Sequence, residues 1–223
     1  MEYEKILDER FVDLYGSTLL PEELCVLDGL CYAISFAVSL PNAVIDGITN
    51  GPTKTYFHHY RTCNSFLDQT AFLLVQAIRR EGYDAAYIPA SQSVSDDGYR
   101  GLLPHKAVAR LCGLGGIGDN DLFLTPEYGC RVRLCTVLTD MPVAHNVPSQ
   151  NPCTHCGLCT RACPSGALCG REWSEGISVQ DMIDVGKCSM HMKKSYQKIG
   201  RGAVCGICMA VCPVGTRKEM KTL

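Results

Sequence analysis

The chain contains 223 residues, of which 46% are hydrophobic and 20% charged, and its formal net charge is −2. This composition is typical of a globular protein with a sizeable core, and it excludes a general electrostatic attraction to nucleic acid or anionic membranes. No apolar signal segment opens the chain, and no apolar run reaches the ~20 residues that a membrane span needs. With 15 cysteines and no export signal, we expect a protein of a reducing cytoplasm, that of an anaerobe, without membrane association.

The first half of the chain predicts short strands around one long helix. Residues 1–30 predict irregular helix, with a helix start at Pro21. Residues 31–40 are an apolar run before Pro41 and predict a buried strand, with a buried helix as the alternative. Residues 54–80 predict a long helix that ends before Gly82, because four apolar residues recur on one face: Leu67, Ala71, Leu74 and Ile78. Residues 83–90 predict a second strand, and the polar residues 91–101 predict a loop.

The second half begins with a short predicted helix over residues 105–111. The glycine-rich stretch 113–118 follows, and it matches neither the dinucleotide-binding fingerprint nor the phosphate-binding loop. In residues 130–140 polar and apolar side chains alternate, with Arg131 and Arg133 on one face, and this pattern predicts a half-buried strand. Residues 141–152 contain three prolines and predict a linker. The sequence therefore predicts two domains, an α/β domain over residues 1–147 and a ferredoxin-like domain over residues 148–223.

Two cysteine runs dominate the last third of the chain. The run from Cys153 to Pro164 has the spacing C-x2-C-x2-C-x3-C-P of bacterial ferredoxins, in which the fourth cysteine ligates the other cluster. The run from Cys205 to Pro213 matches it without the leading cysteine. Structural zinc also uses C-x2-C pairs, but it requires neither a third cysteine at this spacing nor the Cys-Pro ending. The runs thus predict two [4Fe-4S] clusters.

The ligands divide between the runs in a crossed pattern. The first cluster would take Cys153, Cys156, Cys159 and Cys212. The second would take Cys163, Cys205, Cys208 and one more cysteine, for which Cys188 and Cys169 are the two alternatives.

Three segments that precede the cysteine runs resemble epoxyqueuosine reductases and, more distantly, reductive dehalogenases: residues 105–118, 124–129 and 133–140. The resemblance implies an α+β protein, with a nitroreductase-like α/β domain followed by the two-cluster ferredoxin-like domain. It assigns Cys188 to the second cluster. It also implies a base-off corrinoid (cobalamin) in the α/β domain, reduced through the clusters by an external low-potential donor, and a small-molecule substrate.

The resemblance further implies site residues. Tyr99 falls at the position of the catalytic proton donor, with Asp96 or Asp97 close enough to replace it. The residues expected on the corrinoid are Tyr56, His59, His105, Lys106, Gly113, Gly115, Gly116 and Gly118; for the histidines and Lys106 the alternative is a solvated helix end. Gly116 stands where the family usually has tryptophan. Because the family's helical-repeat tail is absent, a tRNA substrate is not expected.

A second function class stays open, an electron-transfer module that delivers electrons to a partner protein and holds no corrinoid. His155 and His191 lie near cluster ligands, where they either donate hydrogen bonds to sulfur or stay at the surface. We expect the remaining cysteines to behave as small buried hydrophobic residues: Cys25, Cys31, Cys63, Cys112, Cys130 and Cys135.

Overall fold

The computed structural model describes residues 3–200 and 204–216; residues 201–203 and 217–223 of the predicted ferredoxin-like domain lie outside the described residues. The chain divides into two compact units. The first consists of Met1–Ser39, Thr62–Leu114 and Arg133–Ser149, and the second of Leu40–Arg61, Gly115–Val132 and Gln150–Leu223. The second unit thus includes two segments from the half that the sequence assigns to the α/β domain.

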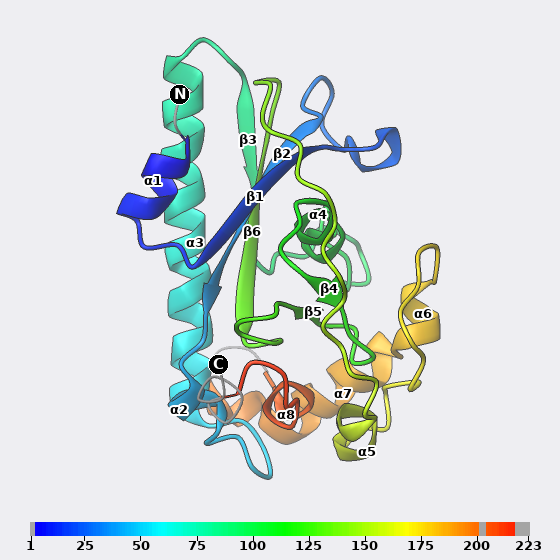
Figure 1. Cartoon of the computed structure of the whole chain (residues 1–223). Helices are drawn as coiled ribbons and strands as arrows, with labels where there is room; N and C mark the ends of the chain where they lie inside the picture. The colour runs from blue at the N-terminus through cyan, green and yellow to red at the C-terminus, as the bar shows by residue number, and fades with distance from the viewer. Residues whose placement is uncertain (1–2, 201–203, 217–223) are drawn as a thin grey trace. The chain divides into compact units, whose positions relative to one another are not determined.

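The first unit is built on a four-stranded sheet with the order β1-β2-β6-β3 (Figure 1). Strand β1 (Leu14–Leu19) pairs antiparallel with β2 (Tyr32–Ser39), and β3 (Ala85–Ile88) pairs antiparallel with β6 (Val132–Thr139). The strand predicted over residues 31–40 is confirmed, and so is the one over residues 83–90. The prediction of helix over residues 1–30 is wrong in its middle, because only α1 (Tyr3–Glu9) and the short turn η1 (Glu22–Leu24) are helical around β1.

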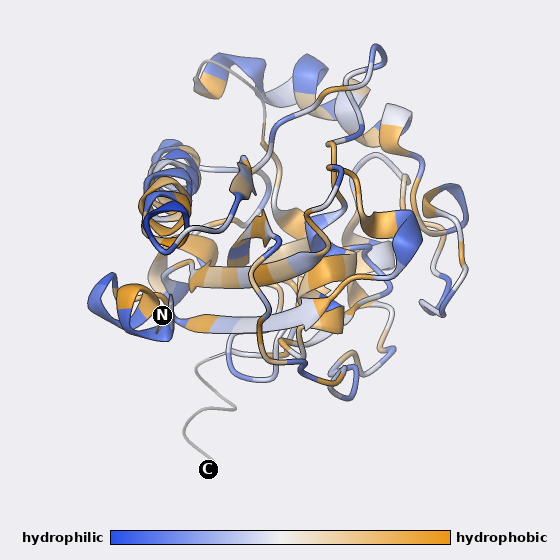
Figure 2. Ribbon diagram, turned by 90° about the horizontal axis from the view of Figure 1, so that it is seen from above, coloured by the Kyte–Doolittle hydropathy of each residue, from blue (hydrophilic) through white to orange (hydrophobic). Residues whose placement is uncertain are grey.

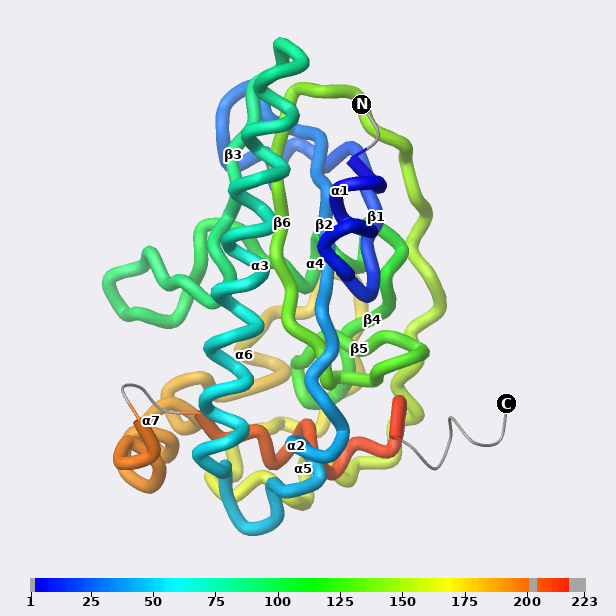
Figure 3. The backbone as a smooth tube through the Cα atoms, turned by 90° about the vertical axis from the view of Figure 1, so that its left-hand side faces the viewer, coloured from blue at the N-terminus to red at the C-terminus, as the bar shows by residue number. Residues whose placement is uncertain are grey.

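The long predicted helix is confirmed as α3, Lys54–Arg80. Its part within the first unit packs on the sheet through residues that are almost fully buried: Leu67, Ala71, Leu74, Val75 and Ile78. These side chains join Ile34, Phe36 and Val137 in one hydrophobic cluster. Figure 2 looks along α3 and shows its apolar and polar stripes, and Figure 3 shows α3 in front of the strands.

Strand β6 differs from its prediction as a half-buried strand. From Cys135 to Thr139 every residue is buried. The reason is that Cys135 and Val137 belong to the cluster under α3, whereas Thr136 faces α4 (His105–Leu111), where its Oγ1 lies 2.8 Å from His105 Nδ1. A central strand covered on both faces has no solvated side. The helix predicted over residues 105–111 is confirmed.

Arg131 is also buried, with 2% of its surface exposed, although the alternating pattern placed it on a solvent face. Its guanidinium donates hydrogen bonds to Asn42 Oδ1 at 2.7 Å and to Asp46 Oδ1 at 2.8 Å.

Two of the six cysteines expected to be buried, Cys25 and Cys31, are instead joined by a disulfide and partly exposed. Cys112, Cys130 and Cys135 are buried as predicted.

The second unit contains short helices connected by turns. Its elements are α2 (Asn42–Ile45), the beginning of α3, the pair β4 (Gly116–Ile117) and β5 (Phe123–Leu124), α5 (Leu158–Ala162), α6 (Val179–Met182), α7 (Val185–Tyr196), η2 (Gln197–Ile199) and α8 (Ile207–Ala210). Helices α5 and α8 pack against each other. Among the helices in the described part of the chain, none is long and apolar enough to cross a membrane.

Candidate iron-sulfur site

The two cysteine runs fold into the same local structure. In each, a cysteine is followed by a glycine with left-handed backbone, Gly157 at φ 68° and Gly206 at φ 82°. Each glycine begins a short helix, α5 or α8, that contains the next cysteine of the run. An L-residue rarely adopts this backbone conformation, so the glycines permit the sharp turn between neighbouring thiols.

Four cysteines that are far apart in the sequence line one cavity of about 250 Å³, here called the Cys163 cavity: Cys163, Cys188, Cys205 and Cys208. Cys188 comes from α7, while Cys205 and Cys208 lie before and within α8. Cys169, the alternative to Cys188, does not line this cavity; it is exposed, and its thiol lies 3.8 Å from the carbonyl oxygen of Gln180.

A second hollow, here called the Cys153 cavity, is lined by the other predicted set: Cys153, Cys156, Cys159 and Cys212. The last of these follows α8, whereas the other three lie on the turn that leads into α5. The structure therefore brings each predicted group of four cysteines to a cavity of its own.

The thiols of the Cys163 cavity differ in acidity. Burial raises the pKa of Cys205, Cys188 and Cys208, and neighbouring thiols raise it further in Cys188 and Cys208. Burial also disfavours the Cys163 thiolate, but hydrogen bonds from the Ser165 hydroxyl and from nearby backbone N–H groups outweigh it, so the pKa of Cys163 is lowered. The thiolate is the form that binds metal, so a metal cluster would replace the protons of the thiols whose pKa is raised.

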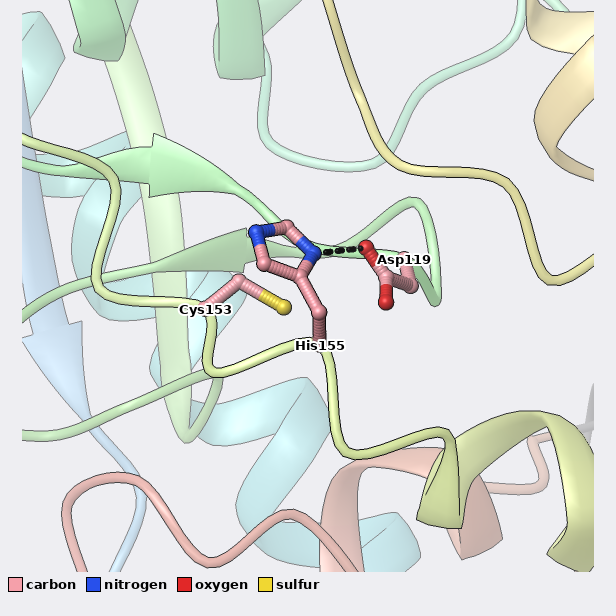
Figure 4. Close-up of side chains that lie close together, drawn as sticks. All are labelled: Asp119, Cys153 and His155. Carbon is pink, nitrogen blue, oxygen red and sulfur yellow. Dashed lines mark hydrogen bonds and ion pairs between the residues drawn. The ribbon is translucent and has the colours of Figure 1, made fainter.

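Asp119, Cys153 and His155 form a compact group beside the Cys153 cavity (Figure 4). His155 Nδ1 lies 2.9 Å from Asp119 Oδ1, and His155 Nε2 lies 3.2 Å from Glu172 Oε1. Both ring nitrogens thus face carboxylates, which leaves neither for a cluster sulfur. Of the two alternatives for His155, the structure favours the surface position, since the residue is exposed.

Sequence reasoning missed a polar residue between the cavities. Asn120 lines both of them and is 4% exposed. Its Nδ2 donates to the Cys208 carbonyl oxygen at 3.4 Å and lies 3.9 Å from Cys130 Sγ. A hydrogen bond between Cys130 and Cys212, together with burial, raises the pKa of the Cys130 thiol. No spacing rule identifies Asn120, because its partner Cys208 is far away in the sequence.

The residues expected on a corrinoid have other partners. In His105, Nδ1 lies near Thr136 Oγ1 and Nε2 lies 3.3 Å from the carbonyl oxygen of Pro89, and burial lowers the pKa of the ring. Lys106 is partly buried next to it in α4. Tyr56 is buried and lines the Cys163 cavity, while His59, further along α3, is partly buried.

The glycines are needed for packing within the protein itself. A Cβ at Gly113 would press on the carbonyl oxygen of Val147, and at Gly115 it would overlap that of Leu124. At Gly116 a Cβ would meet Asn151, and at Gly118 it would meet the Leu124 side chain. Close approach to a macrocycle is therefore not required to explain these glycines.

Tyr99 lies in the loop 91–101 with 41% of its surface exposed. Of the two nearby carboxylates, Asp97 organises this loop by accepting hydrogen bonds from the Ser95 hydroxyl at 2.6 Å and the Tyr99 N–H at 2.9 Å. These bonds lower the pKa of Asp97. A carboxyl of lowered pKa is ionised near neutral pH, so Asp97 is a poor proton donor.

Comparison with known proteins agrees with the cysteine geometry. Residues 152–215 match the model of the 4Fe-4S double cluster binding domain. The chain is 33% identical over 116 residues to the epoxyqueuosine reductase of Listeria monocytogenes, covering 51% of this chain and 30% of that protein. It is 32% identical over 163 residues to the tetrachloroethene reductive dehalogenase of Sulfurospirillum multivorans, covering 68% of this chain and 29% of that protein.

The fold is shared with solved structures of both kinds. A catabolic reductive dehalogenase superposes with a TM-score of 0.77 at 19% identity, over 98% of this chain and 32% of the other. Epoxyqueuosine reductase with a tRNA stem loop superposes with a TM-score of 0.66 at 20% identity, over 96% of this chain and 64% of the other. The chain spans about a third of the length of the curated relatives it matches. Residues 152–215 are thus a 4Fe-4S double cluster binding domain, in a chain similar to epoxyqueuosine reductases and reductive dehalogenases.

Proposed function

We propose that the protein is an iron-sulfur oxidoreductase that relays electrons through two [4Fe-4S] clusters. The single observation that supports this most strongly is the separation of eight cysteines into two cavities. The Cys153 cavity would hold one cluster on Cys153, Cys156, Cys159 and Cys212. The Cys163 cavity would hold the other on Cys163, Cys188, Cys205 and Cys208.

The donor chemistry fits this assignment. Thiolates are the ordinary ligands of iron-sulfur clusters, and each cavity offers four of them. Burial raises the pKa of three thiols around the Cys163 cavity, and a bound cluster would offset that cost by binding their thiolates. No ligand type other than cysteine thiolate is required.

The path between the clusters would run through α8 and Asn120. Cys208 and Cys212 bracket the end of α8 and line different cavities, and Asn120 lines both. An external low-potential donor would deliver electrons at the Cys153 cluster, because Cys156 is the exposed member of the eight cysteines. We also propose that the protein acts in the cytoplasm and that the boundary between its α/β domain and its ferredoxin-like domain lies between residues 147 and 148.

Anaerobic reconstitution followed by a reductive titration tests the relay. We expect a broad visible band that bleaches on reduction, and two one-electron steps that are resolved by EPR. A chain that binds zinc instead, or that holds a single cluster after full reconstitution, would contradict the proposal.

A second candidate, a corrinoid-dependent reductase, is supported by the fold. A reductive dehalogenase described as acting by B12-dependent dehalogenation superposes with a TM-score of 0.78 at 18% identity, over 99% of this chain and 32% of the other. A bound corrinoid would supply a strongly reducing cobalt centre. The site residues described above give this candidate no further support. His105 contacts Thr136 within the protein, and the glycines are explained by close packing against neighbouring residues of the chain. In this candidate function, the first domain would be a nitroreductase-like α/β domain that holds the corrinoid.

In this candidate Tyr99 would donate a proton to the substrate from its exposed loop, and the substrate would be a small molecule or a group on a partner protein. Cobalamin titrated into the reconstituted protein should show the spectral change of base detachment. Tyr99→Phe should leave that change intact and lower turnover by ~10²–10⁴-fold. An unchanged cobalamin spectrum would leave the electron-transfer module as the function. Because one neighbour structure contains a tRNA stem loop, a stem loop belongs among the substrates tested.

A further inference from the structure

We infer that His191 donates a hydrogen bond from Nε2 to sulfur of the cluster in the Cys163 cavity and thereby raises the reduction potential of that cluster. This inference rests on the proposed cluster assignment. It starts from two observations on one side chain. His191 lines the Cys163 cavity, and its Nε2 is a buried nitrogen without a hydrogen-bond partner among the described residues.

The position of His191 follows from the helix that supplies a cluster ligand. Cys188 and His191 are three residues apart on α7, so both side chains lie on one helix face. The start of α7 is fixed by Asp184, whose side chain accepts the Lys187 N–H at 2.9 Å. The thiol and the imidazole therefore reach the same cavity as one rigid pair.

A second aromatic ring contacts the imidazole. The ring of Tyr196 packs edge-on against it, with centroids 5.3 Å apart and an interplanar angle of 82°. Tyr196 in turn lies against Gly51, where a Cβ would come within 3.0 Å of the tyrosine ring. The imidazole of His191 thus packs against a ring, that of Tyr196, which does not line the cavity.

Two further polar groups at the cavity have partners of their own. Ser165 Oγ lies 3.4 Å from Cys163 Sγ. Asn120 donates to the Cys208 carbonyl oxygen and accepts the Leu122 N–H at 3.1 Å. Cluster sulfides and cysteine thiolates are hydrogen-bond acceptors, and they are the groups that a cluster brings to this cavity. A buried N–H without an acceptor is costly, so a sulfur acceptor completes the site.

The consequence is a shift of potential. Reduction adds negative charge to the cluster, which strengthens a hydrogen bond donated to its sulfur; the reduced form is stabilised more than the oxidised form. Removal of the donor should therefore lower the potential of this cluster alone. His155, with both ring nitrogens on carboxylates, gives no such effect at the other cluster.

The test compares EPR-monitored redox titrations of the reconstituted full chain. His191→Phe keeps a ring against Tyr196 and removes the donor, while His191→Gln keeps an N–H. We expect His191→Phe to reduce the equilibrium constant for reduction of this cluster about tenfold, a shift of ~59 mV for one electron. His191→Gln should recover part of the shift. His58→Phe, an exposed histidine of α3, is the matched control and should change neither cluster.

A second measurement does not depend on any variant. Wild-type protein labelled with ¹⁵N-histidine should show nitrogen coupling to the reduced cluster in pulsed EPR. If both clusters are present and neither the coupling nor the potential shift is seen, the inference on His191 fails while the proposed relay stands. If the wild-type chain assembles no cluster in the Cys163 cavity, both fail together.

Discussion

Cys208 lies within α8 and Cys212 lies two residues after its end, yet each lines a different cavity. The last cysteine of each run, Cys163 or Cys212, thus lines the cavity that holds the other cysteines of the opposite run. Helix α8 is therefore a shared structural element of both proposed clusters.

The cluster region should depend on iron for its structure. Each set of four thiols comes from segments that are far apart in the sequence, and metal-binding free energy here contributes directly to folding. We expect chelation to release the chain after residue 150 to limited proteolysis, while the sheet under α3 keeps its protection. Hydrogen exchange of the apo and reconstituted forms measures this directly. Equal protection of both regions in the apo form would contradict it.

The buried thiols of the first unit predict a loss of stability at alkaline pH. Burial raises the pKa of Cys112 and Cys135 from 9.0 to about 12. Below pH ~9 neither the folded nor the unfolded chain loses these protons, so their contribution is fully present. As the pH rises from about 9 toward 12, the unfolded chain ionises first, and the free energy of unfolding falls by at most about 1.4 kcal/mol per pH unit and thiol.

Denaturant unfolding followed by circular dichroism between about pH 8 and 11 checks this sign. Cys135→Val should make the pH slope shallower, because one buried thiol is gone. Cys169→Ala removes an exposed thiol and should leave the slope as in the wild type. If the pH slope is the same in Cys135→Val as in the wild type, the Cys135 thiol does not contribute to the pH dependence of the free energy of unfolding.

Gly115 should tolerate no side chain, whether or not a cofactor is bound. Its φ is 154°, and a Cβ would overlap the carbonyl oxygen of Leu124. We expect Gly115→Ala to destabilise the protein by about 1–3 kcal/mol through overpacking, in addition to backbone strain. Gly82→Ala is the control, since Gly82 has a φ of 90° but open space around it. Equal losses of unfolding free energy in the two variants would mean that the clash at Leu124 is relieved.

The elements that depend only on neighbouring residues were mostly predicted correctly from the sequence. The apolar period of α3 and the spacing from Cys153 to Cys163 depend on residues within one or two turns, so the helix and the crossed pattern of ligands follow from spacing. The choice of Cys188 over Cys169 came instead from the family resemblance. The prediction for β1 was wrong because its edge position leaves only three of its six residues buried, which gives no clear strand pattern.

The rest depended on contacts between distant segments. The solvent face expected for β6 is covered by α4, and Asp119 and Asn120 at the cavities come from the turn after the glycine-rich stretch. The resemblance suggested a cofactor role for that stretch, whereas the structure explains its glycines by packing against Leu124, Asn151 and Val147. Periodicity cannot reveal which backbone lies opposite a glycine.

The crossed arrangement of ligands is tested most directly by EPR of the reduced Cys212→Ser protein. The expected result is loss of the signal from the cluster on Cys153, Cys156 and Cys159, with the cluster on Cys205 and Cys208 retained. Cys163→Ser should give the reverse, and Cys169→Ser, outside both cavities, should retain both signals. Selective loss of the Cys205 cluster in Cys212→Ser, with the Cys153 cluster intact, would contradict the account.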